Sequence, residues 1–144
     1  QESRFFEPGD EVVVAKTPFG NLGLMVCYDL RFPELALQLR QRGAEILTAP
    51  AAFTYTTGQM HWQLLLQARG LDSQCYVLGS AQQGWHGEKR QTWGHAGASD
   101  GLGRLLSMVD DVGSQLIQIN FDREALQAVR QAMPLMQHRR LFNF

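Results

Sequence analysis

The chain has 144 residues, of which 44% are hydrophobic and 19% charged, a composition typical of one globular domain. Thirteen basic against 14 acidic residues give a net charge of -1, so neither nucleic acid nor an acidic membrane surface is expected as a partner. No apolar run approaches the roughly 18 residues of a membrane helix, and Gln1–Arg4 lacks a signal-peptide core, so a cytoplasmic location is predicted.

Up to residue 80 the chain alternates between β-rich and helical patterns, which favours an α/β fold. Pro18 and Gly20 lie between two β-rich runs and suit a hairpin-like turn. Pro33 suits the first turn of a helix, and Gly43 suits its end. The expected strands are Glu11–Lys16, Leu22–Cys27, Glu45–Ala49 and Cys75–Ser80, and the expected helices are Pro33–Gly43 and Gly58–Ser73.

Beyond residue 80 the pattern is looser. Gln82–Thr92 is polar and contains glycines, which predicts a loop. Asp100–Gly103 predicts a turn between two strands. A dinucleotide-binding motif is the less favoured interpretation of its two glycines, because the third glycine of that motif is lacking. The other expected elements are strands at Ala96–Ser99, Arg104–Met108 and Gln115–Phe121, and a helix from an Asp122 N-cap to Pro134.

Cys27 ends an apolar, strand-like run, and a helix start follows within six residues. A sharp turn between a strand and a helix lifts a thiol out of the core, and the amides after it can meet a developing oxyanion. Most free cysteines are instead small buried hydrophobes. From the local pattern alone, the nucleophile and the core residue remain equally open.

Metal binding is not expected, because the four histidines stand far apart and show no metal-ligand spacing. His61 or His95 could supply the histidine of a Cys-His-Asp triad, although a structural, hydrogen-bonding histidine is the commoner role. Cys27 and Cys75 fall in separate predicted strands, so both are expected to be free thiols.

Four blocks of the sequence, in order, resemble the nitrilase superfamily, the carbon-nitrogen hydrolases. Met25–Leu35 resembles the cysteine block of that family. Within the superfamily, Phe53–Trp62 resembles the branch of deaminated glutathione amidases and ω-amidases. The other three blocks are Glu2-Ser3 with Pro8–Asp10, Pro50–Thr54 with Thr57-Gly58 and His61-Trp62, and Ser73–Val77 followed by Trp93–His95 and His138–Arg140.

The resemblance implies a fold and a chemistry. The fold would be α/β, with residues 1–144 as the C-terminal part of a single carbon-nitrogen hydrolase domain and the second half of a four-layer αββα sandwich. A small-molecule amide would be cleaved through a thioester on Cys27, with the Tyr28 backbone amide as oxyanion donor and Glu2 as a supporting glutamate. No cofactor or metal would take part.

The same resemblance suggests substrates and the residues that bind them. Deaminated glutathione would yield 2-oxoglutarate and cysteinylglycine, and an ω-amidase would act on 2-oxoglutaramate instead. Arg31, four residues after Cys27, could bind a substrate carboxylate bidentately or form an ion pair with a nearby acid. Phe53, Thr54 and Thr57 are expected to line the pocket, although loop threonines often cap turns instead.

The chain departs from the family pattern in one respect. The family's general-base glutamate and oxyanion lysine belong to segments that precede residue 1. We therefore expect the C-terminal portion of a longer protein, inactive alone, whose full-length form is a homodimer or a higher homo-oligomer. The alternative is a non-catalytic remnant that keeps only the packing and dimerising surfaces of the fold.

Overall fold

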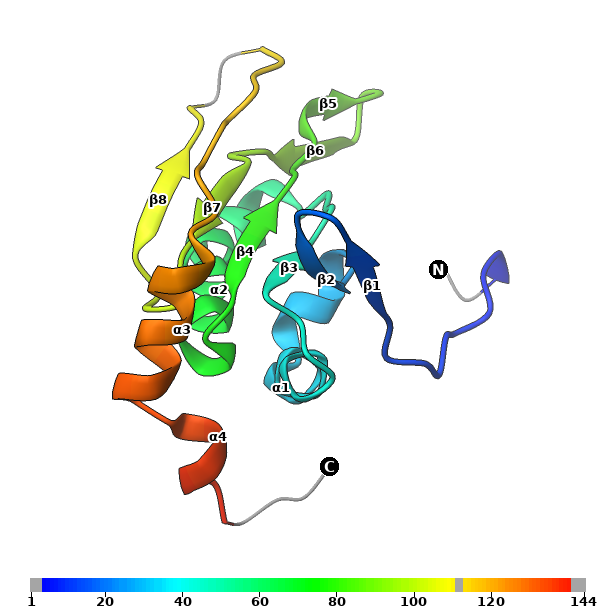
Figure 1. Ribbon diagram of the computed structural model, residues 1–144. Helices are drawn as coiled ribbons and strands as arrows, with labels where there is room; N and C mark the ends of the chain where they lie inside the picture. The colour runs from blue at the N-terminus through cyan, green and yellow to red at the C-terminus, as the bar shows by residue number, and fades with distance from the viewer. Residues whose placement is uncertain (1–3, 111–112, 141–144) are drawn as a thin grey trace.

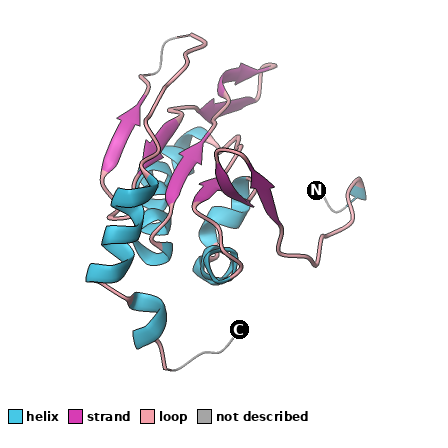
Figure 2. Ribbon diagram, viewed as in Figure 1, coloured by secondary structure: helices cyan, strands magenta, loops and turns pink. Residues whose placement is uncertain are grey.

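The computed structural model describes residues 4–110 and 113–140, in which a six-stranded sheet carries helices on both faces (Figures 1 and 2). The strand order is β1-β2-β3-β4-β7-β8. These strands are β1 (Val14–Thr17), β2 (Gly20–Leu24), β3 (Ile46–Thr48), β4 (Tyr76–Gly79), β7 (Gly97–Ser99) and β8 (Leu105–Met108). The helices are α1 (Pro33–Gln41), α2 (Tyr55–Ser73), α3 (Arg123–Ala132) and α4 (Leu135–His138), with a 3-10 turn η2 (Cys27–Arg31).

The strand and helix pattern predicted for the first eighty residues is confirmed, with shifts of a few residues at the ends. β1 and β2 form the expected antiparallel hairpin, in which Thr17 pairs with Gly20. The Thr17 hydroxyl accepts a hydrogen bond from the Gly20 amide at 3.2 Å, and this bond closes the turn. Pro33 occupies the first turn of α1, where its missing N–H costs nothing.

The three central strands β2, β3 and β4 run parallel, linked by crossovers that contain α1 and α2. Both helices cover the same face of the sheet, where Leu47 and Val77 meet Leu39, Trp62 and Leu66 in a core with no exposed side chain among these five. Parallel strands end at one edge of a sheet, so the loops that follow β2, β3 and β4 lie together. That edge holds Cys27.

The opposite face of the sheet is covered by α3, which is drawn to the left of β4 in Figure 1. Leu126 of α3 packs with Ile46 and Tyr76 in a second buried cluster. The predicted N-cap is confirmed, because the Asp122 carboxylate accepts the Ala125 amide at 2.9 Å. Helix α3 ends before Pro134, as expected, and the short α4 follows it.

The strand predicted at Gln115–Phe121 is wrong. No strand is formed there, and Ile119 and Phe121 of this segment instead pack against the second cluster. The alternation of apolar and polar residues is real, since Ile117, Ile119 and Phe121 are half-buried between exposed neighbours. An alternating apolar and polar pattern indicates that one face of a segment is buried. It does not show whether a neighbouring strand is available for pairing.

The loop predicted at Gln82–Thr92 is also wrong. β5 (Gln83–His86) and β6 (Arg90–Trp93) form a separate two-stranded hairpin, in which His86 pairs with Arg90. Gly87 takes the positive φ of 67° that the connecting turn requires. Most side chains of the hairpin are exposed or half-buried, so the apolar alternation that marks a strand in sequence is missing.

The turn predicted at Asp100–Gly103 is confirmed, with β7 and β8 on its two sides. One Asp100 oxygen accepts the amides of Leu102 and Arg104, and the other accepts Arg104 Nε at 2.7 Å. Within residues 4–110 and 113–140, no helix combines the length and the apolar character needed to cross a bilayer.

Candidate active site

Cys27 occupies the tight connection between β2 and α1, as the sequence predicts. Strand β2 ends earlier than expected, at Leu24, and Cys27 is the first residue of the 3-10 turn. Its φ is 49°, in the left-handed region that non-glycine residues rarely adopt. The Cys27 amide donates to the Pro50 carbonyl at 2.8 Å, which ties this strained residue to the end of β3. Such strain persists only where the surrounding structure enforces it.

Two other amides of this turn are already used within it. Asp29 N donates to the Val26 carbonyl at 3.0 Å, and Val26 N donates to the Asp29 carboxylate at 2.8 Å. Within the described residues, no protein group accepts the Tyr28 amide. An amide without an acceptor, one residue after a thiol, is a donor that an oxyanion could use.

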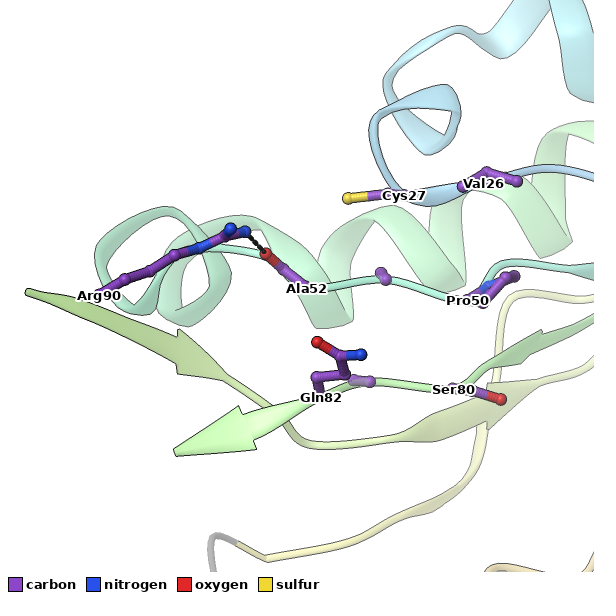
Figure 3. Close-up of a pocket in the computed structure, with 9 residues that line it drawn as sticks. Val26, Cys27, Pro50, Ala52, Ser80, Gln82 and Arg90 are labelled. Carbon is purple, nitrogen blue, oxygen red and sulfur yellow. Dashed lines mark hydrogen bonds between the residues drawn. The ribbon is translucent and has the colours of Figure 1, made fainter. Parts of the chain in front are cut away.

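The Cys27 sulfur faces a pocket of about 500 Å³ at the carboxyl edge of the parallel strands (Figure 3). The wall segments are held together by backbone bonds from Ala51 N to the Ser80 carbonyl at 2.8 Å and from Gln82 N to the Ala51 carbonyl at 2.9 Å. The lining residues are Val26, Cys27, Pro50, Ala51, Ala52, Ser80, Ala81, Gln82 and Arg90.

Arg90 is the one charged residue among these lining residues, and none of them is acidic. It is the first residue of β6 and donates through Nη2 to the Ala52 carbonyl at 3.3 Å. The pocket of the described chain therefore presents a thiol, small aliphatic walls and a cation, and no carboxylate that could act as a general base.

Arg31 lies beside Cys27 in the sequence but does not line this pocket. Its guanidinium lies 5.2 Å from the Tyr28 ring centroid and 5.0 Å from that of Phe53, both within range of a cation–π contact. Arg31 Nη1 donates to His61 Nδ1 at 3.2 Å. No ion pair joins it to an acid of the described chain, and its role toward substrate stays a prediction.

The pocket residues predicted in the next segment are Phe53, Thr54 and Thr57. Phe53 is 7% exposed and packs edge-on against Trp62, with ring centroids 5.2 Å apart. Thr54 is the N-cap residue of α2, and its hydroxyl meets that of Thr57 at 2.8 Å. None of the three predicted residues lines the Cys27 pocket, whereas Ala52, just before Phe53, does.

The two histidines weighed as triad members have structural contacts. His95 stacks on Trp93 with centroids 4.0 Å apart, and its carbonyl accepts Trp62 Nε1 at 2.6 Å. His61 Nδ1 accepts a hydrogen bond from the Arg31 guanidinium. Neither histidine lines the Cys27 pocket, so the geometry of the described residues gives no support to a Cys-His-Asp triad.

Cys75 has the opposite environment to Cys27, although both are free thiols as expected. Its side chain has no exposed area, and its thiol donates to the Ala44 carbonyl at 3.3 Å. Burial raises the pKa of the Cys75 thiol and disfavours the thiolate, despite a contact from Arg130 at 3.4 Å. Cys75 is a core residue.

Several residues around Cys27 were not among the predicted site residues. Pro50, Ser80 and Gln82 follow strands β3 and β4, so the rule that sites form beyond the carboxyl ends of parallel strands could have found them. No sequence pattern indicated that Arg90 reaches the pocket, because the β5–β6 hairpin that carries it was predicted to be a loop. Glu2, the predicted supporting glutamate, lies outside the described residues.

The model of the family described as carbon-nitrogen hydrolase matches residues 1–131. The chain belongs to this family. Deaminated glutathione amidase of Yersinia enterocolitica is 46% identical over 140 residues, which are 97% of this chain and 49% of that protein. The Synechocystis protein of the same name is 52% identical over 122 residues, 84% of this chain and 44% of that protein. The chain thus spans about half the length of the curated relatives it matches.

Solved structures of the nitrilase superfamily confirm the expected fold class. Saccharomyces cerevisiae Nit3, of branch 10 of the superfamily, has a TM-score of 0.88 at 34% identity, covering 97% of this chain and 51% of Nit3. An amidase from Nesterenkonia has a TM-score of 0.69 at 25% identity, covering 76% of this chain and 41% of that one. That structure carries the acetamide moiety of fluoroacetamide on its active-site cysteine.

Proposed function

We propose that this chain carries the nucleophile of an amidase that cleaves a small-molecule amide through a thioester on Cys27. One observation carries the proposal: Cys27 is held at a φ of 49° with its side chain at a pocket formed by the ends of three parallel strands. A strained cysteine at such a turn is suited to attack a carbonyl from outside the core. The adduct on the active-site cysteine of the Nesterenkonia amidase supports the assignment.

The reaction has two halves. A base takes the Cys27 proton as sulfur attacks the amide carbon, and collapse of the tetrahedral oxyanion breaks the C–N bond while the leaving amine gains a proton. Water, activated by the same base, then hydrolyses the thioester and regenerates the thiol. An ordinary thiol has a pKa of about 8.5, so a base is needed at neutral pH.

The Tyr28 amide is the oxyanion donor that this chain contributes. It lies next to the nucleophile and has no acceptor within the described residues. The family's base glutamate and lysine would come from chain ahead of residue 1, with Glu2 as the supporting glutamate. No carboxylate lines the described pocket, which is consistent with a base supplied from elsewhere.

We propose deaminated glutathione as the substrate, with 2-oxoglutarate and cysteinylglycine as products, because relatives from bacteria and mammals carry that name. The second candidate is an ω-amidase acting on 2-oxoglutaramate. Arg31, Phe53, Thr54 and Thr57 are retained as proposals for the substrate side of the site, although none of them lines the Cys27 pocket.

We also propose that residues 1–144 form the C-terminal part of one domain in a cytoplasmic homo-oligomer. The face of the sheet that α3 covers is left partly open, with Leu24 44% exposed, and Val26 beyond the end of its strand is 60% exposed. An apolar sheet surface of this kind favours a covering layer. The alternative is a non-catalytic remnant of the same fold, which would keep this packing without turnover.

The test is hydrolysis by the full-length protein of deaminated glutathione and, separately, of 2-oxoglutaramate. We expect turnover that Cys27→Ala removes and Cys75→Ala leaves in place, since Cys75 is buried in the core. A higher kcat/KM for 2-oxoglutaramate would select the ω-amidase. No turnover of either amide by a folded full-length protein would favour the non-catalytic remnant.

A further inference from the structure

We propose that Arg90 is a specificity-determining residue that binds a carboxylate of the substrate in the Cys27 pocket. This inference rests on the proposed function, in which Cys27 is the nucleophile. It adds the residue of this chain that selects an amide carrying a carboxylate.

The composition of the pocket supports this role. Its walls are mostly small and aliphatic, and Arg90 is the one cation among the described lining residues. Figure 3 shows the Cys27 sulfur pointing to the side of the pocket on which the Arg90 guanidinium lies. A ligand that places its carbonyl at Cys27 therefore has a positive charge available at the other end of the pocket.

The Arg90 guanidinium has N–H donors that are not used within the described chain. Arginine carries five N–H donors, and one hydrogen bond of Arg90, to the Ala52 carbonyl, is formed in the described chain. No carboxylate of the described residues pairs with it. That bond directs the guanidinium along the pocket wall and leaves the rest of its planar fork for a bidentate carboxylate.

The other arginine near Cys27 is less available. Arg31 is engaged by the rings of Tyr28 and Phe53 and by His61, and it does not line the pocket. A second cation on the hairpin, Lys89, lies next to Arg90 in the sequence but is not a lining residue either. Lys89 therefore offers a matched control for the loss of one positive charge.

A carboxylate could belong to the acyl fragment or to the leaving amine. Three amides with the same five-carbon acyl chain separate these sources: glutaramate, charged on the acyl side; N-pentanoyl-cysteinylglycine, charged on the amine side; and neutral pentanamide. In the full-length protein we expect Arg90→Gln to lower kcat/KM by about 10- to 100-fold for the charged substrate that Arg90 binds, mainly through KM. Pentanamide should change less than about twofold.

The controls separate binding from support of the fold. Arg90→Lys should restore part of the loss, because charge returns without the fork. An equal loss for all three amides would assign Arg90 to holding the Ala52 segment and overturn the proposal. An equal effect of Lys89→Gln would reduce the role to long-range attraction. Charge-selective loss in Arg31→Gln with none in Arg90→Gln would move the role to Arg31.

A second measurement does not depend on amide hydrolysis, so it distinguishes failure of this inference from failure of the proposed function. The rate of Cys27 alkylation is compared for iodoacetate, which is anionic, and iodoacetamide, which is neutral. We expect Arg90→Gln to lower the iodoacetate-to-iodoacetamide rate ratio by at least about fivefold, and Lys89→Gln to leave it within about twofold. An unchanged ratio in Arg90→Gln would overturn the proposal even if the amidase is active.

Discussion

The two thiols of the chain occupy different surroundings. Cys27 opens a strained turn at the edge of a pocket, whereas Cys75 is enclosed by the sheet and has a raised pKa because of burial. Only the thiolate is a strong nucleophile, so reactivity follows exposure and pKa together.

The first prediction concerns this difference. Iodoacetamide applied to the folded full-length protein should label Cys27 at least about tenfold faster than Cys75. Peptide mapping by mass spectrometry measures both adducts, and the unfolded protein, in which both thiols are exposed, is the control. Preferential labelling of Cys75 in the folded protein would contradict the assignment of the nucleophile.

The second prediction concerns Arg31. If this residue binds a substrate carboxylate, Arg31→Lys raises KM for anionic amides several-fold with little change in thermal stability, because the fork is lost while the charge remains. Steady-state kinetics and a melting curve on the same preparation measure both. A lower Tm with an equal loss for neutral and anionic amides would show that ring packing and the His61 contact are its whole role.

At the scale of elements, α3 is fixed at its start by a side-chain cap. The Asp122 carboxylate accepts the Ala125 amide, and loss of such a cap typically costs about 1 kcal/mol. Asp122→Ala should therefore lower the free energy of unfolding by about this amount, while Asp122→Asn, which can also cap, should lower it much less. Urea unfolding measures both, and equal losses would show that the cap contributes little.

The start of α3 is also bound through an ion pair to Glu45, the residue just before β3. Glu45 Oε1 accepts Arg123 Nε at 2.8 Å. Burial alone would raise the pKa of Glu45, but the hydrogen bonds from Arg123 and from the Asn21 amide outweigh it, so the pKa lies below its ordinary value. A lowered folded-state pKa stabilises the fold above the unfolded pKa, and this contribution is lost as pH falls through the folded value.

It follows that Glu45→Gln should lower Tm at neutral pH and that the difference from wild type should shrink toward zero as pH falls below about 4. Melting curves between pH 3 and 8 measure this difference, with Glu124→Gln, at an exposed position of α3, as the control. A difference that grows on acidification would have the wrong sign for this account.

The elements that were predicted correctly are those whose pattern reports a buried face. The runs at β2, β3 and β4 and the periodic helices carry such a signal. The Asp122 cap was predicted from a different signal, a residue type that caps helices through its own side chain. The β5–β6 hairpin was missed because it is mostly solvent-facing, and Gln115–Phe121 was mistaken because an extended segment can bury alternate residues without joining a sheet.

For the site as well, residues with a local sequence signal could be predicted and residues placed by tertiary packing could not. Cys27 could be predicted because its motif is local, a strand end followed by a helix start. Arg90 could not, since it reaches the pocket from a hairpin that lies across the edge of three strands, and that placement depends on tertiary packing. The contacts of Arg31 with Phe53 and His61 join different elements and likewise have no local signal.

For the whole molecule, the account predicts that residues 1–144 alone do not turn over amides. No carboxylate of the described residues lines the pocket, so neither proton transfer nor water activation has a base. Loss of a general base costs roughly 100- to 10,000-fold, and loss of one good oxyanion donor about 100- to 1000-fold. Co-expression with the proposed upstream half should restore activity. Hydrolysis by the segment alone, abolished in Cys27→Ala, would show that a residue within it acts as base.

The central claim is that Cys27 forms the covalent intermediate, and mass spectrometry of the acid-quenched full-length protein tests it most directly. During turnover of deaminated glutathione, the account predicts an added 2-oxoglutaryl group on the peptide that contains Cys27, and no adduct in Cys27→Ala. An acyl adduct on another residue, or undiminished hydrolysis by Cys27→Ala, would contradict the account.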